Sequence, residues 1–279
     1  MVISVNLWIN TFSGQLILQV IRLRNILLVL AGLPVLLVLL WTIAVPVDLI
    51  RERLESAVAG QAGSNAALSI NGLRKGIFFT LSAESLDLKI DSRPALRIDD
   101  FSGSFTPRYL TSGKPGFDIK GKIGTGDVSG ILKLPLEGSI KTARAELREI
   151  PYMTRFDTEI TGHVDSDIRI NGNVIKITFD VPDLDIDDSA SIIPLLNTFR
   201  KLQGALSVQG NTIQIESISL EGEKGFARLR GSIKGNDMDM SLELMPAAGA
   251  LNTLESMVIG KYIVSPGYYV VPIRGALPR

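Results

Sequence analysis

The chain divides into an uninterrupted apolar segment near its N-terminus and a long region in which apolar and polar residues alternate. Residues 25–47 carry no charge and are mostly Leu, Val, Ile and Ala. At about 1.5 Å of rise per residue, this segment as a helix is about 34 Å long, enough to cross a hydrocarbon layer of about 30 Å. We therefore predict one transmembrane helix at residues 25–47.

A cleaved signal peptide is the alternative for this segment, but its apolar part has only about 7–15 residues and ends at a small-residue cleavage site. The nearest Ala-x-Ala sequence here, Ala57 to Ala59, follows a charged stretch. Arg22 and Arg24 flank the segment closely, and Trp41 lies toward its other end, where an indole ring suits the membrane interface. We expect residues 1–24 to be a cytoplasmic tail and the body to be exported.

Apolar residues recur at helical spacing directly after this segment, and charged residues lie between them. The apolar positions are Val47, Ile50, Leu54, Ala57 and Val58. The pattern predicts an amphipathic juxtamembrane helix at residues 48–63, because Gly60 and Gly63 suit its end.

From Ala67 onward the dominant period is two, which is typical of antiparallel strands with one apolar and one solvated face, and we place a β-rich domain at residues 64–279. Residues 164–170 and 175–181 alternate on both sides of Asn171-Gly172-Asn173, and this arrangement predicts a hairpin. We expect a mainly β domain of about 12–16 antiparallel strands, joined to the single transmembrane helix.

The clearest alternation lies between residues 202 and 244, where a change of parity between Ile215 and Ile218 predicts a β-bulge. Two architectures remain open for the apolar face of this region. It forms the core of a closed sandwich, or it lines an apolar groove in a folded-over sheet. The residues of this face are Leu206, Val208, Ile213, Ile215, Ile218, Leu220, Met238, Met240, Leu242 and Leu244.

Two short helices interrupt the alternation, and we expect them to cap the ends of the sheet. The first is predicted from Ser189 to Leu202, where apolar residues recur at helical spacing before Gly204. The second is predicted from Ala247 to Val258 and ends at Gly260.

Composition restricts the chemistry that this chain can perform. Its 29 basic and 29 acidic residues give a net charge of zero, so no basic field exists to attract nucleic acid. The absence of cysteine excludes thiolate metal sites, cysteine nucleophiles and disulfides. With His163 as the single histidine, we expect neither an enzyme nor a bound cofactor.

Two motifs that resemble ligand sites have simpler explanations. Residues 124–130, Gly-Thr-Gly-Asp-Val-Ser-Gly, resemble a dinucleotide fingerprint, but no helical pattern follows them, so we predict a turn between strands. The acidic run from Asp183 to Asp188 resembles a calcium loop, but Asp188 replaces its glycine and Pro194 replaces its glutamate. These acids are instead typical of a strand end and a helix start.

A third motif consists of His163, Asp165 and Asp167, which alternate along one predicted strand and therefore share a face. That geometry is compatible with a weak metal site and with an ordinary solvated strand face. The second interpretation is the commoner one among proteins.

Several segments resemble a known family. The apolar span, Pro46-Val47-Asp48 and the stretch Ile70-Asn71-Gly72-Leu73-Arg74-Lys75-Gly76 have a layout that resembles protein N of bacterial type II secretion systems (GspN). Residues 202–206, 230–233 and 244–246 are similar to the C-terminal part of the related AsmA-like proteins. Residues 271–278 resemble the last strand of both groups, so that the resemblance covers residues 25–279.

The resemblance implies a single-pass protein of the bacterial inner membrane with a cytoplasmic N-terminus and a periplasmic β domain. For the GspN group it implies a non-enzymatic assembly component of the secretion system, which contacts other periplasmic domains through exposed strand edges. For the AsmA-like group it implies a lipid-binding or lipid-transfer protein that holds acyl chains in an apolar groove and serves outer-membrane homeostasis. Neither group brings catalytic residues.

Overall fold

The computed structural model describes residues 32–276, except residues 34, 63–65, 91, 134–136, 154–158, 188–195 and 236. The predicted cytoplasmic tail, with Arg22 and Arg24, lies outside the described residues, as does the first part of the predicted transmembrane segment.

The described N-terminal part is helical up to a break before Pro46. Residues 32–33 and 35–39 are helical and lead into η1, a π-helical turn at Leu40–Ala44. Val45 is extended, which is the conformation that a following proline favours, and α2 (Val47–Ala62) begins directly after Pro46. In the part of the chain that is described, no helix combines the length and the apolar content needed to cross a membrane.

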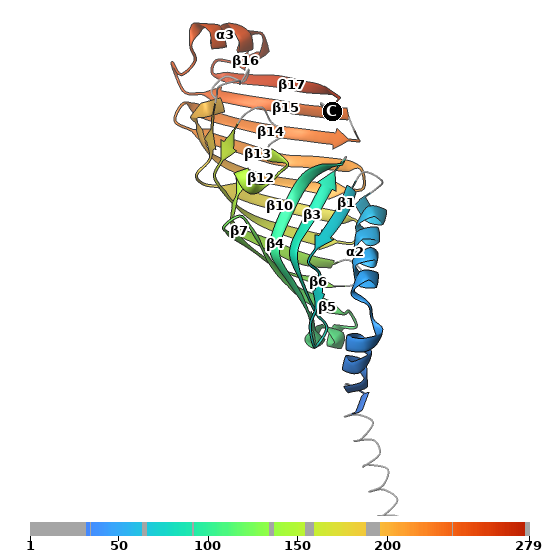
Figure 1. Ribbon diagram of the computed structural model, residues 1–279. Coiled ribbons are helices and arrows are strands. Elements are labelled where there is room, and N and C mark those ends of the chain that lie inside the picture. The colour runs from blue at the N-terminus through green and yellow to red at the C-terminus, as the bar shows by residue number, and fades with distance from the viewer. Residues whose placement is uncertain are drawn as a thin grey trace, which may run out of the picture.

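The rest of the described chain is mainly β, and one antiparallel sheet contains most of it, as the alternation predicted (Figure 1). Neighbouring strands in this fifteen-stranded sheet are almost always neighbours in sequence, so that the sheet is a meander. Its strands, in chain order, are β1 (Ala66–Asn71), β2 (Arg74–Lys75), β3 (Thr80–Ile90), β4 (Arg93–Thr106), β5 (Gly116–Ile123), β6 (Gly126–Lys133), β7 (Glu137–Glu146), β9 (His163–Asn171), β10 (Val174–Val181), β12 (Phe199–Gln209), β13 (Thr212–Gly222), β14 (Gly225–Lys234), β15 (Asp237–Pro246), β16 (Ile263–Ser265) and β17 (Tyr268–Ala276).

The remaining described elements are short. Two strands, β8 (Ile160–Thr161) and β11 (Asp185–Ile186), form a separate two-stranded sheet. The other helical elements are α3 (Thr253–Ile259) and the 3₁₀ segments η2 (Pro107–Ser112), η3 (Leu147–Glu149), η5 (Leu196–Thr198) and η6 (Gly260–Tyr262).

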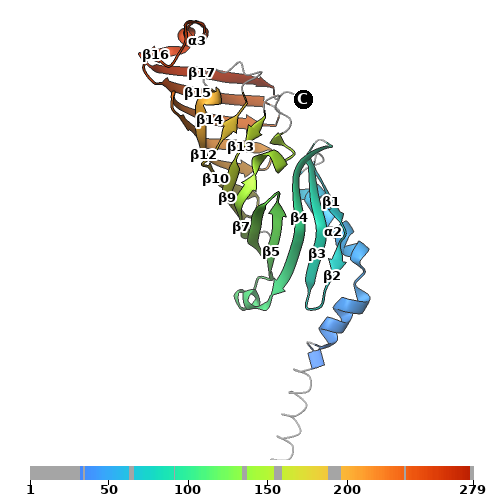
Figure 2. The same ribbon diagram turned by 60° about the vertical axis from the view of Figure 1, so that its left-hand side comes forward.

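The main sheet is long and strongly twisted, as expected for strands of L-residues. Figures 1 and 2 show β1 to β4 beside α2 at one end, and β15 to β17 below α3 at the other. At the first end, Val47 and Ile50 of α2 pack against Ile70, Leu73 and Ala83. Glu55 of α2 also accepts a hydrogen bond from the backbone N–H of Ile70, at 3.2 Å, so that α2 is joined to strand β1.

The predicted hairpin and bulge are both present. Strands β9 and β10 pair up to Asn171 and Val174, on either side of a two-residue turn. The pairing of β13 with β14 shifts between Ile215 and Ile218, which restores both residues to the same face. The segment at residues 124–130 forms the turn between β5 and β6 and the start of β6, as the strand interpretation required.

The first predicted capping helix is wrong over residues 199–202, and residues 196–198 form only the 3₁₀ segment η5. Residues 188–195 lie outside the described chain, but Phe199 to Leu202 belong to strand β12. A register shift between Phe199 and Lys201 lets Phe199 and Leu202, which are three positions apart, face the same side of the sheet. Their spacing in the sequence therefore resembles that of a helix.

The second predicted capping helix begins later than expected. Residues 247–251 are irregular, and α3 starts after Asn252, whose side chain accepts a hydrogen bond from the N–H of Glu255. The Glu255 side chain accepts the N–H of Asn252 in return, so a capping box sets the start of the helix. Consequently Ile259 is buried, whereas Val258 of the predicted apolar stripe is exposed.

The largest core cluster lies where the small sheet, α3 and the C-terminal strands meet. It includes Phe199, which is only 1% exposed, together with Leu147, Val181, Leu184, Ile186, Ala227, Leu244 and Ile259.

Replacing Phe199 by alanine should lower the free energy of unfolding of the chain by about 3–5 kcal/mol, because it leaves a cavity at the centre of this cluster. Urea unfolding followed by circular dichroism measures the change. Val264→Ala, at an exposed position of β16, is the control and should change stability little. Equal losses in both variants would contradict the assignment of Phe199 to the core.

Candidate functional site

The strand register aligns the apolar residues of the sheet into rows that cross the strands on one face. The first row runs from β4 to β15 through Phe105, Phe117, Leu132, Gly138, Ile170, Ile175, Val208, Ile213, Ile233 and Met238. The second row runs from β5 to β17 through Ile119, Gly130, Ile140, Ile168, Ile177, Leu206, Ile215, Gly231, Met240 and Ile273. Each residue pairs directly with the next, so both rows continue across every strand between their ends.

These two apolar rows include six of the ten residues that the sequence analysis assigned to the apolar face. The six are Leu206, Val208, Ile213, Ile215, Met238 and Met240. The other four residues lie on the same face. Ile218 and Leu242 both pair with Leu229, and Leu220 and Leu244 both pair with Ala227.

Burial divides the face into a covered and an uncovered part. Leu220, Leu242 and Leu244 pack in the largest core cluster, below the small sheet and α3. By contrast, the apolar side chains of the two rows from β9 to β17 are half-buried, except that Ile215 is 6% exposed. Side chains in the middle of a wide sheet are fully buried when another layer covers them, so the rows lack such a layer within the described chain.

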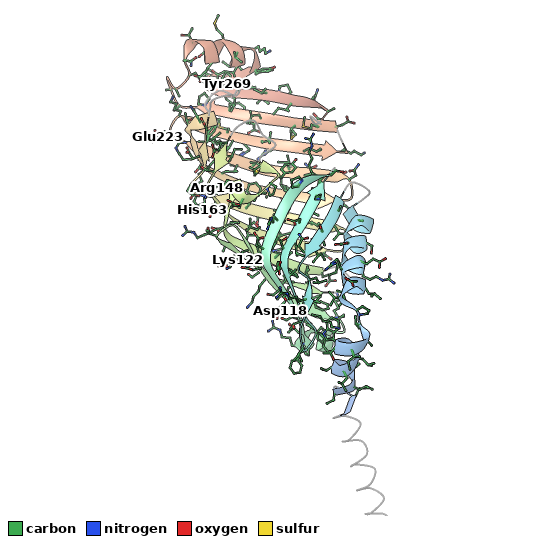
Figure 3. All side chains as sticks on the ribbon, in the orientation of Figure 1. Asp118, Lys122, Arg148, His163, Glu223 and Tyr269 are labelled. Atoms are coloured by element: carbon green, nitrogen blue, oxygen red, sulfur yellow. The ribbon has the colours of Figure 1, made fainter. Side chains whose placement is uncertain are left out.

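The opposite face of the sheet carries the polar and charged side chains. Examples are the ion pair of Arg274 with Asp239, at 2.9 Å, and that of Arg169 with Asp167, at 3.4 Å. Asp118 and Lys122 of this face lie toward the N-terminal end of the sheet, whereas Tyr269, near its C-terminal end, is on the apolar face opposite Leu244 (Figure 3). The sheet is therefore amphipathic along its whole length.

An aromatic chain connects the N-terminal helical segment to the first row. The ring centroids of Trp41 and Phe79 are 5.3 Å apart, those of Phe79 and Phe105 are 5.9 Å apart, and those of Phe105 and Phe117 are 5.7 Å apart. Such separations are typical of favourable aromatic pairs. Trp41 is the only one of these residues that the sequence pattern indicated, because only the strand register brings the three phenylalanines together.

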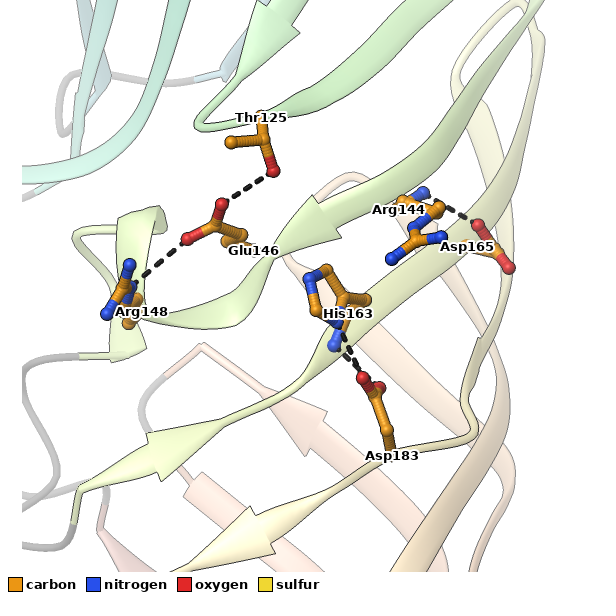
Figure 4. Close-up of polar contacts among 7 residues, drawn as sticks. All are labelled: Thr125, Arg144, Glu146, Arg148, His163, Asp165 and Asp183. Carbon is orange, nitrogen blue, oxygen red and sulfur yellow. Dashed lines mark hydrogen bonds and ion pairs between the residues drawn. The ribbon is translucent and has the colours of Figure 1, made fainter.

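A polar cluster lies on η3, the start of β9 and the link after β10 (Figure 4). Asp183 Oδ2 is 2.5 Å from Nδ1 of His163, and Asp183 Oδ1 accepts the backbone N–H of His163 at 2.8 Å. These hydrogen bonds hold the pKa of Asp183 below its ordinary value. Asp183 and His163 thus join the link after β10 to the first residue of β9.

The neighbouring acids of this cluster have separate partners. Glu146 accepts hydrogen bonds from Thr125, at 2.6 Å, and Arg148, at 3.1 Å, and the Thr125 bond above all lowers the pKa of Glu146. Asp165 accepts the backbone N–H of Arg144, a residue with a positive φ of 54°. The acids in this cluster therefore stabilise turns and strand ends.

The structure does not bring His163, Asp165 and Asp167 to one point. Their partners are Asp183, Arg144 and Arg169, respectively. Among the described residues, no three His, Asp or Glu side chains are arranged to hold a metal ion. Asp185 and Asp187 line a polar hollow of about 540 Å³, in which Arg200 lies 3.4 Å from Asp185.

Comparisons of the chain with protein-family models, with curated proteins and with solved structures found no match.

Replacing Asp183 by asparagine should make the stability of the chain less sensitive to acid. Because the folded-state pKa of Asp183 is lowered, its contribution is fully present above the unfolded pKa of about 3.9 and is lost as the pH falls through the folded value. Asp183→Asn removes that contribution at neutral pH and should therefore flatten the acid side of the stability profile.

Urea midpoints measured from pH 7 to pH 2 provide the test. Asp237→Asn, at an exposed acid at the start of β15, serves as the control and should retain the slope of the native chain. An unchanged slope in Asp183→Asn would contradict the role given to its contact with His163.

Proposed function

We propose that this chain binds lipid acyl chains on the two apolar rows of its sheet, next to a membrane that holds its N-terminal helix. The observation that supports this proposal is the continuity of the rows across strands that leave them half-buried from β9 to β17. Apolar surface gains about 25 cal/mol for each Å² that it removes from water, so acyl chains lying on the rows are held without any specific polar contact.

The dimensions of the rows suit this role. Neighbouring strands lie about 4.8 Å apart, so a row that crosses from β5 to β17 extends over about 43 Å. One leaflet of a bilayer accommodates its acyl chains within about 15 Å. The rows are therefore long enough for a lipid to occupy successive positions. Their half-burial from β9 to β17 favours a folded-over sheet with an apolar groove over a closed sandwich.

The chemistry of the face argues for lipid and against a reacting substrate. The side chains of the two rows are apolar, and the charged groups lie on the other face or at strand ends. The same face does carry one polar pair beside the second row, Thr142 and Ser166, whose hydroxyl groups are hydrogen-bonded to each other at 2.9 Å. An apolar surface of this kind binds hydrocarbon without selecting a head group. We therefore propose a non-enzymatic lipid-binding or lipid-transfer protein, in which the body lies in the periplasm of a bacterium.

A photo-reactive amino acid at position 240 should capture lipid, whereas the same group at position 239 should not. Met240 belongs to the second row, and the adjacent Asp239 points to the charged face and is paired with Arg274. The two sites are adjacent on strand β15 and occupy opposite faces of the sheet. The measurement is mass spectrometry of lipid adducts after irradiation of cells that produce the full chain.

Equal labelling at positions 239 and 240 would refute the proposal. Ile213→Asp, on the first row, offers an independent check, since a charge placed there should reduce the amount of co-purified lipid several-fold. Gln214→Asp, at the next position of the same strand and on the opposite face, is its matched control.

A second candidate function is assembly with other secretion components, as the resemblance to the GspN group implies. The observation that favours it is the distal end of the sheet, where β16 is a short edge strand whose residues are all exposed. Ile263 and Val264 of this strand and Met257 and Val258 of α3 present an exposed apolar patch. Exposed strand edges are common sites for pairing with another chain.

Val264→Glu should prevent the recovery of secretion components with the full chain from solubilised membranes, if this patch is the contact. Ser102→Glu, at an exposed position of β4, should leave their recovery unchanged. The assembly role would be refuted if the native chain recovers no such component and its deletion leaves secretion intact.

A further inference from the structure

The turn between β2 and β3, residues 76–79, exposes two large apolar side chains side by side. Ile77 is 62% exposed and Phe78 is 71% exposed. Single exposed apolar residues are ordinary, but two adjacent ones at the tip of a turn form a local apolar surface.

The backbone of this turn is held in a conformation that large residues avoid. Phe78 and Phe79 both have a φ of 58°, in the left-handed region. The Gly76 N–H donates to the carbonyl of Thr80 at 2.9 Å, and the Thr80 hydroxyl donates to the carbonyl of Ile77 at 2.9 Å. Phe79 packs between the rings of Trp41 and Phe105, whereas Phe78 is exposed.

The same turn is bonded to the end of the apolar helical segment. The indole N–H of Trp41 donates to the carbonyl of Gly76 at 2.9 Å. The ammonium group of Lys75 donates to the carbonyls of Trp41, Thr42 and Val45, at 2.7, 3.1 and 2.6 Å. Lys75 thus satisfies the carbonyl groups that a helix leaves unpaired at its C-terminal end.

That helical segment is apolar all round, and its large side chains are exposed. They are Leu33, Val35, Leu36, Leu37, Leu39, Leu40 and Ile43. A helix that docks in a protein groove has one polar face, whereas a helix without a polar face is surrounded by protein or lies in hydrocarbon. The described residues surround only its last turns, so lipid is the occupant that suits the rest of it.

Aromatic and cationic side chains lie around the turn and on the neighbouring η2. The ammonium of Lys75 is 5.5 Å from the ring centroid of Trp41. The guanidinium of Arg108 and the ammonium of Lys133 are each 4.9 Å from the ring centroid of Tyr109. Figure 1 shows η2 at the same end of the sheet as the helical segment. Tryptophan, tyrosine and basic residues are typical of the interface between hydrocarbon and water.

We propose that the turn at residues 76–79 inserts Ile77 and Phe78 into the interfacial layer of the lipid bilayer that holds the apolar helix. Two attachments, the helix and the turn, fix the orientation of the sheet on the membrane. Because Phe79 joins Trp41 to Phe105 and Phe117, this orientation places the start of the first apolar row next to the lipid. The inference rests on the membrane attachment given under Proposed function.

Single cysteines provide a direct test, since the chain contains none of its own. The full chain carrying Phe78→Cys, and separately Ile77→Cys, is labelled with an environment-sensitive fluorophore and reconstituted into phospholipid vesicles. Val264→Cys is the matched control, because Val264 is a 64% exposed apolar residue at the opposite end of the sheet. Quenching by spin-labelled phospholipid should be several-fold stronger at positions 77 and 78 than at position 264.

Equal quenching at positions 78 and 264, in protein that floats with the vesicles, would overturn this inference and leave membrane attachment intact. Failure of the native chain to float with the vesicles would instead refute the attachment itself. The lipid-adduct measurement at positions 239 and 240 is independent of both outcomes. Ile77→Cys decides the question if Phe78→Cys does not fold.

Discussion

The structure depends on the register that keeps every strand of the main sheet in phase with its neighbours. Side chains alternate between the two faces of a strand, so a slip of one residue anywhere would move the apolar residues of the following strands to the charged face. Ile168, Ile177 and Leu206 lie on one face of three successive strands because each pair of these residues is directly opposed. The alternation of apolar and polar residues shifts by one position between Ile215 and Ile218, and a bulge there returns both residues to the same face.

This constraint produces a molecule whose described core is divided among three clusters. α2 covers the first strands, and the small sheet with α3 covers the rows that contain Leu220 and Leu244. The third cluster, Ile123, Val128 and Ala145, packs against Ile140 of the second row, whereas from β9 to β17 the apolar side chains of both rows are half-buried except at Ile215. The stability of the fold and the proposed binding surface therefore reside in different parts of the same face, so that Ile213 and Met240 are open to substitutions that Phe199 is not.

Strict alternation was sufficient to predict the mainly β fold, the hairpin at Asn171 and the bulge after Ile215. It failed near Phe199, because a bulge brings residues three apart to one side and so imitates a helix. It also missed the capping box of Asn252 and Glu255, a local signal that the sequence carries. The aromatic chain from Trp41 to Phe117 could not be predicted, since its members meet only after the strands are in register.

The meander has a consequence for the length of the molecule. Adding or removing one hairpin of two strands leaves the path of the remaining chain unaltered, because almost no connection crosses another strand of the sheet. One such pair changes the span of the sheet by about 9.6 Å, the width of two strand spacings. Duplication or loss of a single hairpin would thus change the length of the sheet, while both ends of the sheet keep their own contacts.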